Sequence, residues 1–156
     1  MTKKRIFFTV LISILIALTV GFIWSNSMKS IPESSDQSEN TYSWVKAVLD
    51  FIFGKGVITH SVFRKLAHFA EFFILGVEVN LLFIAIKKYR FKWLYFQLLI
   101  GLFIAGVDEI IQIFYKRGAS IIDVLIDFSG VLTATLIISL IILIIIKIKT
   151  EKSRKS

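Results

Sequence analysis

Four long runs of apolar residues, separated by polar segments, dominate the pattern of the chain. Residues 6–24 form 19 consecutive positions without a charged side chain. At about 1.5 Å per helical residue, such a run can cross a hydrocarbon core of about 30 Å. Three further runs of comparable length occupy residues 66–86, 93–115 and 121–146. The pattern predicts four membrane-spanning helices.

The connections between these runs predict how the helices are arranged. Residues 87–92 and 116–120 are short turns, so the last three spans should be antiparallel neighbours. The long connection, residues 25–65, contains a polar stretch up to residue 43 that is typical of a flexible exposed loop. The predicted fold is therefore all-α, a small antiparallel bundle of about four transmembrane helices.

One amphipathic helix is expected inside the long connection. Residues 43–54 carry apolar side chains at i, i+3, i+4 and i+7, namely Val45, Val48, Leu49 and Ile52. Such a stripe is typical of a helix that lies at the membrane interface. Gly54 and Gly56 follow it and are suited to end a helix.

Composition and charge agree with a membrane protein. The chain is 56% hydrophobic, more than one small soluble domain could bury. It has no cysteine, which excludes a disulfide-stabilised secreted module. The net charge of +8 comes from basic residues beside the apolar runs, where anionic lipid headgroups attract them, and does not indicate nucleic-acid binding.

The distribution of Lys and Arg predicts the orientation. Three lie in residues 1–5, four in residues 87–92 and five in the tail, residues 147–156, so that twelve of the 19 fall on one side. Basic residues mark the cytoplasmic side. We therefore expect a multi-pass protein of the cell membrane with both termini in the cytoplasm. The first span should be a retained anchor, because no small-residue cleavage site follows it.

Ionisable residues within the spans indicate a site, because each is costly in lipid. Counted from the outer ends of their helices, Glu71, Asp108 and Asp127 lie at similar depths, roughly 8–10 Å. Arg64 and His68 share a helix face with Glu71. These positions predict a charged pocket that opens outward.

The predicted ligand-binding residues lie in or beside this pocket. They are Arg64, Lys65, His68, Glu71, Asp108, Glu109, Gln112, Arg117, Asp123 and Asp127. Glu78 lies two turns below Glu71 and is interpreted as a carboxyl group bonded to a neighbouring helix, with an inward polar path as the alternative.

Three short motifs resemble those of the VanZ-like family. Residues 64–71 (RKLAHFAE) resemble its R-K-x-x-H-x-x-E motif, residues 108–112 (DEIIQ) its D-E-x-x-Q motif, and residues 123–130 (DVLIDFSG) its D-V-x-x-D-x-x-G motif. The resemblance covers roughly residues 20–145. Residues 115–118 (YKRG) depart from the Pro-Gly-Arg loop that is frequent in the family.

The resemblance implies a bacterial envelope protein without implying a reaction. The namesake of the family is associated with resistance to glycopeptide antibiotics, chiefly teicoplanin. From the residues and the resemblance we expect the pocket to bind a lipid headgroup or a cell-wall precursor group, with Arg64, Lys65 and Arg117 on phosphate or carboxylate. Membrane lipids, a wall precursor or the lipoglycopeptide are the expected partners, and a homo-oligomer is compatible with the sequence.

Other interpretations of the same residues stay open. In an enzyme acting on a lipid-linked substrate, His68 would be the general acid or base and Glu71 or Asp108 its partner, although no nucleophile motif is present. In a structural network, the charges would only fix helix packing, and in a proton-coupled transporter Glu78 would contribute. No cofactor is predicted, but the carboxylates with His68 could suit Mg²⁺, Mn²⁺ or Ca²⁺. One histidine without cysteine argues against a typical zinc site.

Overall fold

The computed structural model describes residues 2–29, 31–89, 91–116 and 120–155, and most of these residues are helical. Within these ranges five helices follow one another and no strand occurs. They are α1 (Lys3–Ser27), α2 (Ile31–Phe53), α3 (His60–Ala85), α4 (Phe91–Phe114) and α5 (Ile121–Lys155). The predicted all-α fold class is confirmed.

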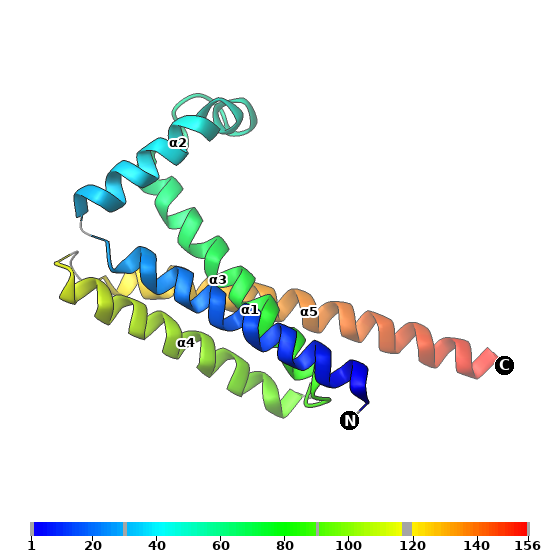
Figure 1. Ribbon diagram of the computed structural model, residues 1–156. Helices are drawn as coiled ribbons and strands as arrows, with labels where there is room; N and C mark the ends of the chain where they lie inside the picture. Colours follow the sequence, from blue (N-terminus) through cyan, green and yellow to red (C-terminus); the bar gives the residue numbers. More distant parts are fainter. Residues whose placement is uncertain (1, 30, 90, 117–119, 156) are drawn as a thin grey trace.

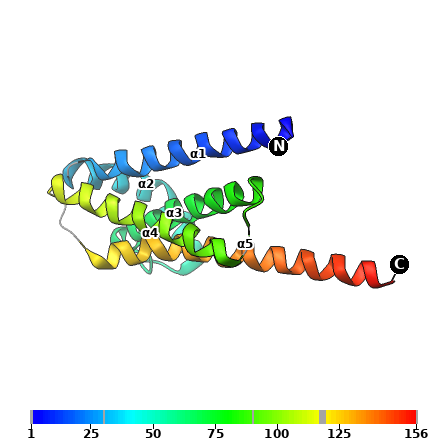
Figure 2. The same cartoon turned by 90° about the horizontal axis from the view of Figure 1, so that it is seen from below.

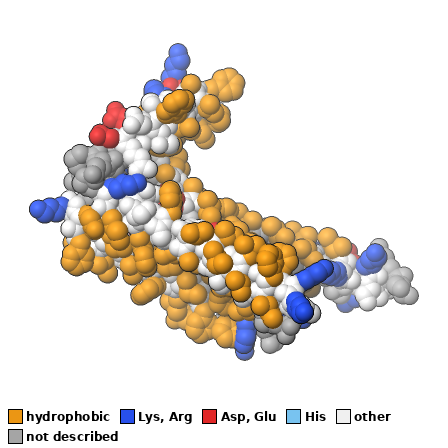
Figure 3. Space-filling model, in the orientation of Figure 1, with side chains coloured by type: hydrophobic (Ala, Val, Ile, Leu, Met, Phe, Trp, Pro, Cys, Tyr) orange, Lys and Arg blue, Asp and Glu red, His pale blue; other side chains and the backbone are white. Residues whose placement is uncertain are grey.

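Four of these helices are long and apolar enough to cross a membrane: α1, α3, α4 and α5. Their surfaces are largely apolar, and Phe7, Leu18 and Phe103 are 63%, 65% and 69% exposed. Figure 3 shows hydrophobic side chains covering the sides of the bundle, whereas Lys and Arg gather towards its ends. An apolar belt of this extent fits contact with lipid and would be unfavourable in water.

The four long helices lie side by side, and α2 projects away from them (Figure 1). Both chain termini lie at one end of the bundle, as Figure 2 also shows. We call this the termini end. At the opposite end, α1 and α4 finish near Ser27 and Phe114, while α3 and α5 begin near His60 and Ile121. We call it the α2 end, because α2 connects there.

The closest packing in the bundle joins α3 to α5 through small residues. A Cβ atom at Gly130 would collide with the backbone of α3, meeting the carbonyl oxygen of Phe69 and lying 2.9 Å from the amide nitrogen of Phe73. A Cβ at Gly76 would lie 2.9 Å from the Cα of Val131. Small residues at helix crossings let two backbones approach closely in a membrane, where packing replaces the hydrophobic effect as the driving force.

The buried core lies where α1 and α4 pack against this α3–α5 pair. Ile23, Phe72, Leu75 and Ala105 are fully buried there. Asn80 in the same region donates a hydrogen bond of 2.9 Å to the hydroxyl oxygen of Thr135, so one polar contact also joins α3 to α5. Such contacts satisfy polar groups that lipid cannot hydrate.

Helix α2 differs from the expectation for the long connection. It begins at Ile31, whereas the sequence suggested a flexible loop to residue 43 and a helix only at 43–54. Composition indicated that this segment buries little surface, but a helix satisfies its backbone internally without a core. Pro32 lies in the first turn, where its missing N–H group costs nothing. The side chain of Tyr42 fixes the helix by donating a 2.7 Å hydrogen bond to the carbonyl oxygen of Ile58.

The C-terminus of helix α2 lies where the sequence predicted it. Gly54 and Gly56, at φ +94° and +77°, adopt the left-handed conformation that glycine allows at the end of a helix. The Asp50 side chain accepts a hydrogen bond of 3.1 Å from the backbone N–H of Gly56, which lowers the pKa of that carboxyl group. The turn into α3 is therefore locally defined.

Two other helices are longer than their apolar runs. Helix α3 begins six residues before the predicted start at 66, because the Thr59 side chain caps it by accepting a hydrogen bond from the N–H of Val62. Helix α5 continues nine residues beyond 146, through a Lys- and Glu-containing tail with good helix propensity. Hydropathy predicts the part of a helix that faces lipid. It does not predict where the helix begins and ends, because the ends depend on capping.

Replacing Gly130 with Ala should destabilise the bundle, because the added methyl group meets backbone atoms that cannot rotate away. We expect a loss of about 1–3 kcal/mol, the usual effect of overpacking, measured as a lower midpoint of thermal unfolding in detergent. The matched control is Gly21→Ala on α1, where nothing lies within 4 Å of the added Cβ. Equal unfolding midpoints for the two variants would contradict this account of the α3–α5 contact.

Candidate functional site

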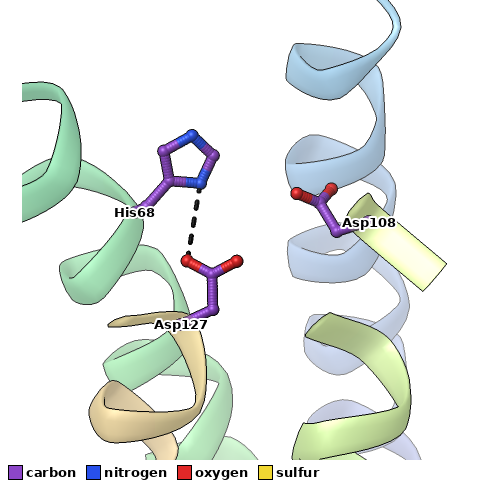
Figure 4. A group of neighbouring side chains, drawn as sticks. All are labelled: His68, Asp108 and Asp127. Carbon is purple, nitrogen blue, oxygen red and sulfur yellow. Dashed lines mark ion pairs between the residues drawn. The ribbon is translucent and has the colours of Figure 1, made fainter. Parts of the chain in front are cut away.

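Three helices bring one histidine and two aspartates together near the α2 end. His68 on α3, Asp108 on α4 and Asp127 on α5 each offer a donor atom, and these atoms lie within 4.8 Å of one another. The Nδ1 atom of His68 is 3.7 Å from Oδ1 of Asp127. Figure 4 shows the three side chains pointing towards a common space. Asp108 and Asp127, which were expected at one depth with Glu71, converge here with His68. The role of these residues in binding stays a prediction.

The contact between α3 and α5 explains why His68 and Asp127 meet. Gly130 lies one helical turn after Asp127 and packs against Phe69, the residue next to His68. The close approach of the two backbones therefore places the turn that carries Asp127 against the turn that carries His68. The spacing from Asp127 to Gly130 in the third motif therefore keeps the carboxyl group one helical turn away from the close contact between the two helices.

Asp108 is held in a fixed orientation from two sides. The hydroxyl group of Ser27, at the end of α1, donates a 2.6 Å hydrogen bond to its Oδ1. Gln112, one turn later on α4, donates a 2.8 Å hydrogen bond to its Oδ2. The carboxyl group is 0% exposed, so these hydrogen bonds replace the water that it would otherwise bind.

A pocket of about 170 Å³ opens above these side chains between α3, α4 and α5. Its lining combines basic, acidic and neutral polar groups with one aliphatic side chain. The lining residues are Ser61, Arg64, Lys65, His68, Gln112, Asp123, Ile126 and Asp127. We call Ser61, Arg64, Lys65 and Asp123, the residues nearest the starts of α3 and α5, the rim; it has two basic side chains and one acid. We call His68, Asp108 and Asp127 the floor. His68 and Asp127 line the pocket, and Asp108 lies next to them without lining it.

The charges of the pocket are arranged unevenly. Asp108 and Asp127 are 0% and 1% exposed, whereas Lys65 is exposed and Arg64 is half-buried. Within the described part of the chain, neither Arg64 nor Lys65 forms an ion pair with an acid, and the ion-pair contact of Asp127 is with His68. The basic rim is therefore available for a ligand, and the floor is acidic.

Several predicted site residues point elsewhere. Glu71 accepts a hydrogen bond of 3.4 Å from the side-chain amide of Asn26 on α1, and it does not line the pocket. Glu109 accepts one from the backbone N–H of Ser120, so it joins the end of α4 to the start of α5. Arg117 lies outside the described residues.

Glu78 is bonded to a neighbouring helix and lies apart from the pocket. The hydroxyl group of Thr19 on α1 donates a hydrogen bond of 3.0 Å to its Oε1 atom. This contact is the helix-to-helix bond that the sequence analysis favoured over an inward polar path. The residue has no part in the floor or the rim as defined above.

Helix α1 contributes residues that the motifs did not reveal. Ser27 binds the floor residue Asp108, and Asn26 binds Glu71. The sequence analysis ended the first span at residue 24 and treated the following residues as loop. A polar pair directly after an apolar run, at the same end of the bundle as the buried acids, was the signal that could have identified them.

The arrangement supports three kinds of chemistry. The imidazole of His68 can accept or donate a proton, and the nearby Asp127 can orient it. The carboxylates with the imidazole can coordinate a cation. Arg64 and Lys65 can bind a phosphate or a carboxylate.

Comparison with known proteins identifies the family. The family model described as VanZ/LLP1 matches residues 5–144, which include all three motifs. No curated protein and no solved structure shows a significant similarity to the chain. The four apolar helices and the family match together make this a multi-pass membrane protein. The resemblance seen in the motifs is thus confirmed, and the chain belongs to the VanZ/LLP1 family.

Proposed function

We propose that the pocket binds an anionic group of an envelope lipid or cell-wall precursor at the outer leaflet, and that this binding contributes to resistance to lipoglycopeptides such as teicoplanin. The observation that carries the proposal is the rim. Arg64 and Lys65 line a hollow formed by three helices and have no acidic partner in the described part of the chain. Cationic side chains held beside a cavity without a partner suit an anionic ligand.

The size of the pocket supports a small group rather than a whole molecule. A volume of about 170 Å³ is below the roughly 300–1,000 Å³ of sites that enclose drug-sized ligands. Phosphate and carboxylate groups are small enough to enter it. Arg64 would bind either group with two parallel hydrogen bonds, and Ser61 could add a third.

The charge distribution along the chain supports an outward-facing pocket. Most Lys and Arg residues that flank the spans lie at the termini end, and such residues favour the cytoplasm. The α2 end, with the pocket, would then face outward. Helix α2 fits this orientation, because Figure 3 shows hydrophobic side chains on the side of α2 that faces the termini end, and acids on the opposite side. That apolar side would lie on the membrane surface, with exposed Trp44 and Phe51.

The rim also separates this proposal from a purely structural network. Glu71, Glu78 and Glu109 each accept a hydrogen bond on one oxygen from a neighbouring helix or turn, as packing would require. Packing does not require two basic side chains to line a cavity that also holds Asp123 and Asp127 without pairing with either of them in the described part of the chain. The family association with teicoplanin then suggests the consequence, since a protein that holds envelope groups at the outer surface changes how much target the antibiotic finds.

An enzyme acting on a lipid-linked substrate is the second candidate. It is favoured by the pair His68 and Asp127, in which a carboxyl group lies beside an imidazole that faces a cavity. Conversion of the bound probe in the binding experiment below, followed by mass spectrometry, would favour this alternative over binding alone.

Substitutions in the rim should weaken anion binding. Full-length protein in phosphatidylcholine nanodiscs is titrated with three probes: short-chain phosphatidylglycerol, a prenyl pyrophosphate, and an acylated D-Ala-D-Ala peptide. For the preferred probe we expect Arg64→Ala to weaken binding about tenfold or more, because a charge-assisted hydrogen bond contributes roughly 1.5–3 kcal/mol. The affinity of Arg64→Lys should lie between those of the wild type and Arg64→Ala, since lysine keeps the charge but cannot form the bidentate contact.

The control for these variants is Lys55→Ala, at an exposed lysine near the α2 end that does not line the pocket.

In the native bacterium, Arg64→Ala at normal protein abundance should increase teicoplanin susceptibility more than vancomycin susceptibility, and Lys55→Ala should change neither. Probe affinities that are equal for Arg64→Ala and Lys55→Ala would refute binding at the rim.

The orientation can be tested directly, because the chain has no cysteine of its own. Single-cysteine variants at exposed positions, Ser43→Cys on α2 and Ser153→Cys on α5, are treated with a membrane-impermeant maleimide on intact cells. We expect the cysteine at 43 to react at once and the cysteine at 153 to react only after permeabilisation. The reverse order would place the pocket in the cytoplasm and exclude an outer-leaflet ligand.

A further inference from the structure

The floor of the pocket poses an electrostatic problem for an anionic ligand. Asp108 and Asp127 are almost completely buried, and no Lys or Arg of the described chain forms an ion pair with either of them. Two ionised carboxylates in such surroundings repel each other and repel an anion above them. A positive charge at the floor would relieve this repulsion and favour a ligand held by Arg64 and Lys65.

We propose that His68, Asp108 and Asp127 hold one divalent cation of the Mn²⁺ or Zn²⁺ class at the floor of the pocket. Their donor atoms come from three different helices and lie within 4.8 Å of one another. Atoms that bind one ion at about 2.0–2.2 Å lie roughly 3–4 Å apart. The 3.7 Å between His68 and Asp127 already falls in that range, so only a small closure towards Asp108 is needed.

The hydrogen bonding of the two carboxyl groups supports this assignment. Oδ1 of Asp127 is buried and has no hydrogen-bond donor, although buried carboxylate oxygens normally have one. Figure 4 shows the carboxyl group of Asp127 directed into the space between His68 and Asp108. Oxygens of Glu71, Glu78 and Glu109 also lack a donor, but among the described residues only Asp127 combines such an oxygen with a place in a group of possible ligand atoms.

Asp108 has the complementary property of a fixed orientation. Ser27 and Gln112 each donate a hydrogen bond to one of its oxygens. Each carboxylate oxygen keeps a second lone pair with which it can bind an ion. Hydrogen bonds of this kind hold metal-binding carboxylates in place, and their loss typically weakens metal binding 10–100-fold.

The donor set determines the class of ion. Imidazole nitrogen suits transition ions, whereas carboxylate oxygen alone would suit Mg²⁺ or Ca²⁺. One imidazole with two carboxylates is therefore best matched by Mn²⁺. Zn²⁺ can bind the same three atoms, although a set with one histidine and no cysteine is not that of a typical zinc site. Three protein ligands leave a coordination position open. Two of the three ligands, His68 and Asp127, line the pocket, from which a further ligand could reach the ion.

The open position would complete the anion site. A phosphate or carboxylate oxygen could bind the ion from the pocket while Arg64 and Lys65 hold the remaining oxygens. This part of the inference rests on the proposed function, whereas the binding of the ion depends only on the floor residues. The two can consequently be tested separately.

The test measures ion binding before any anion is added. Full-length protein in nanodiscs is stripped with EDTA and titrated with MnCl₂, with free Mn²⁺ followed by electron paramagnetic resonance and with ZnCl₂ as competitor. We expect one saturable site per chain with a dissociation constant below about 1 mM, which is the value of the weakest known calcium sites. Asp127→Asn and His68→Gln should each weaken it at least about tenfold.

The matched control is Asp36→Asn, which removes an exposed carboxylate of α2 that belongs neither to the pocket lining nor to the floor and should leave the titration unchanged. Because the wild-type titration needs no variant, a substitution that prevents folding does not affect its outcome. Absence of saturable Mn²⁺ and Zn²⁺ binding to the wild type overturns the inference, as does equal binding by Asp36→Asn and a folded Asp127→Asn.

A second titration separates the ion from the ligand. Short-chain phosphatidylglycerol should bind the Mn²⁺-loaded protein at least about tenfold more tightly than the stripped protein. Anion binding that depends on Arg64 but not on the ion would refute the claim that the ion completes the anion site and leave the proposed function intact. Ion binding at the floor without any Arg64-dependent anion binding would support the metal site and refute the proposed function.

Discussion

The contact between Gly130 and the backbone of α3 is the constraint on which the rest of the structure depends. Any side chain at position 130 would meet the carbonyl oxygen of Phe69, so the two helices can approach this closely only with glycine there. In lipid, where no hydrophobic force drives helices together, close backbone contact is a main source of association. The same contact sets Asp127 against His68, so that the packing of the fold and the geometry of the site have one cause.

The membrane imposes a second constraint, which separates structural polar residues from those of the pocket. A polar group without water must find a partner inside the bundle. Glu71 and Glu109 have found theirs in Asn26 and Ser120, and Asn80 donates to Thr135. In the pocket, Oδ1 of Asp127 lacks a hydrogen-bond donor and its carboxyl group is directed towards His68 and Asp108. Arg64 lines the same cavity as Asp123 and Asp127 without forming an ion pair with either in the described part of the chain. A ligand that binds these groups would explain both features.

Much of this arrangement could be predicted from the sequence, because depth and helical face follow from counting residues along an apolar run. Counting placed Glu71, Asp108 and Asp127 at one level and His68 on the same helix face as Glu71, and the structure brings the two aspartates together with His68. It could not predict which way Glu71 and Glu109 point, since residues on one face can still contact different neighbours. Helix α2 was expected to begin at 43, because a polar composition excludes a core but not a helix. Ser27 was missed because capping and helix extension, which hydropathy does not report, carry α1 past its apolar run.

The central claim is that α3 and α5 hold positions 68 and 127 next to each other in the folded protein within the membrane. Because the chain has no cysteine, the double variant His68→Cys, Asp127→Cys can be treated with the shortest bifunctional methanethiosulfonate and examined by intact mass spectrometry. We predict the mass of a single internal crosslink, whereas the control pair His68→Cys, Ser153→Cys should carry two separate modifications. Two separate modifications on the 68–127 pair would contradict the account.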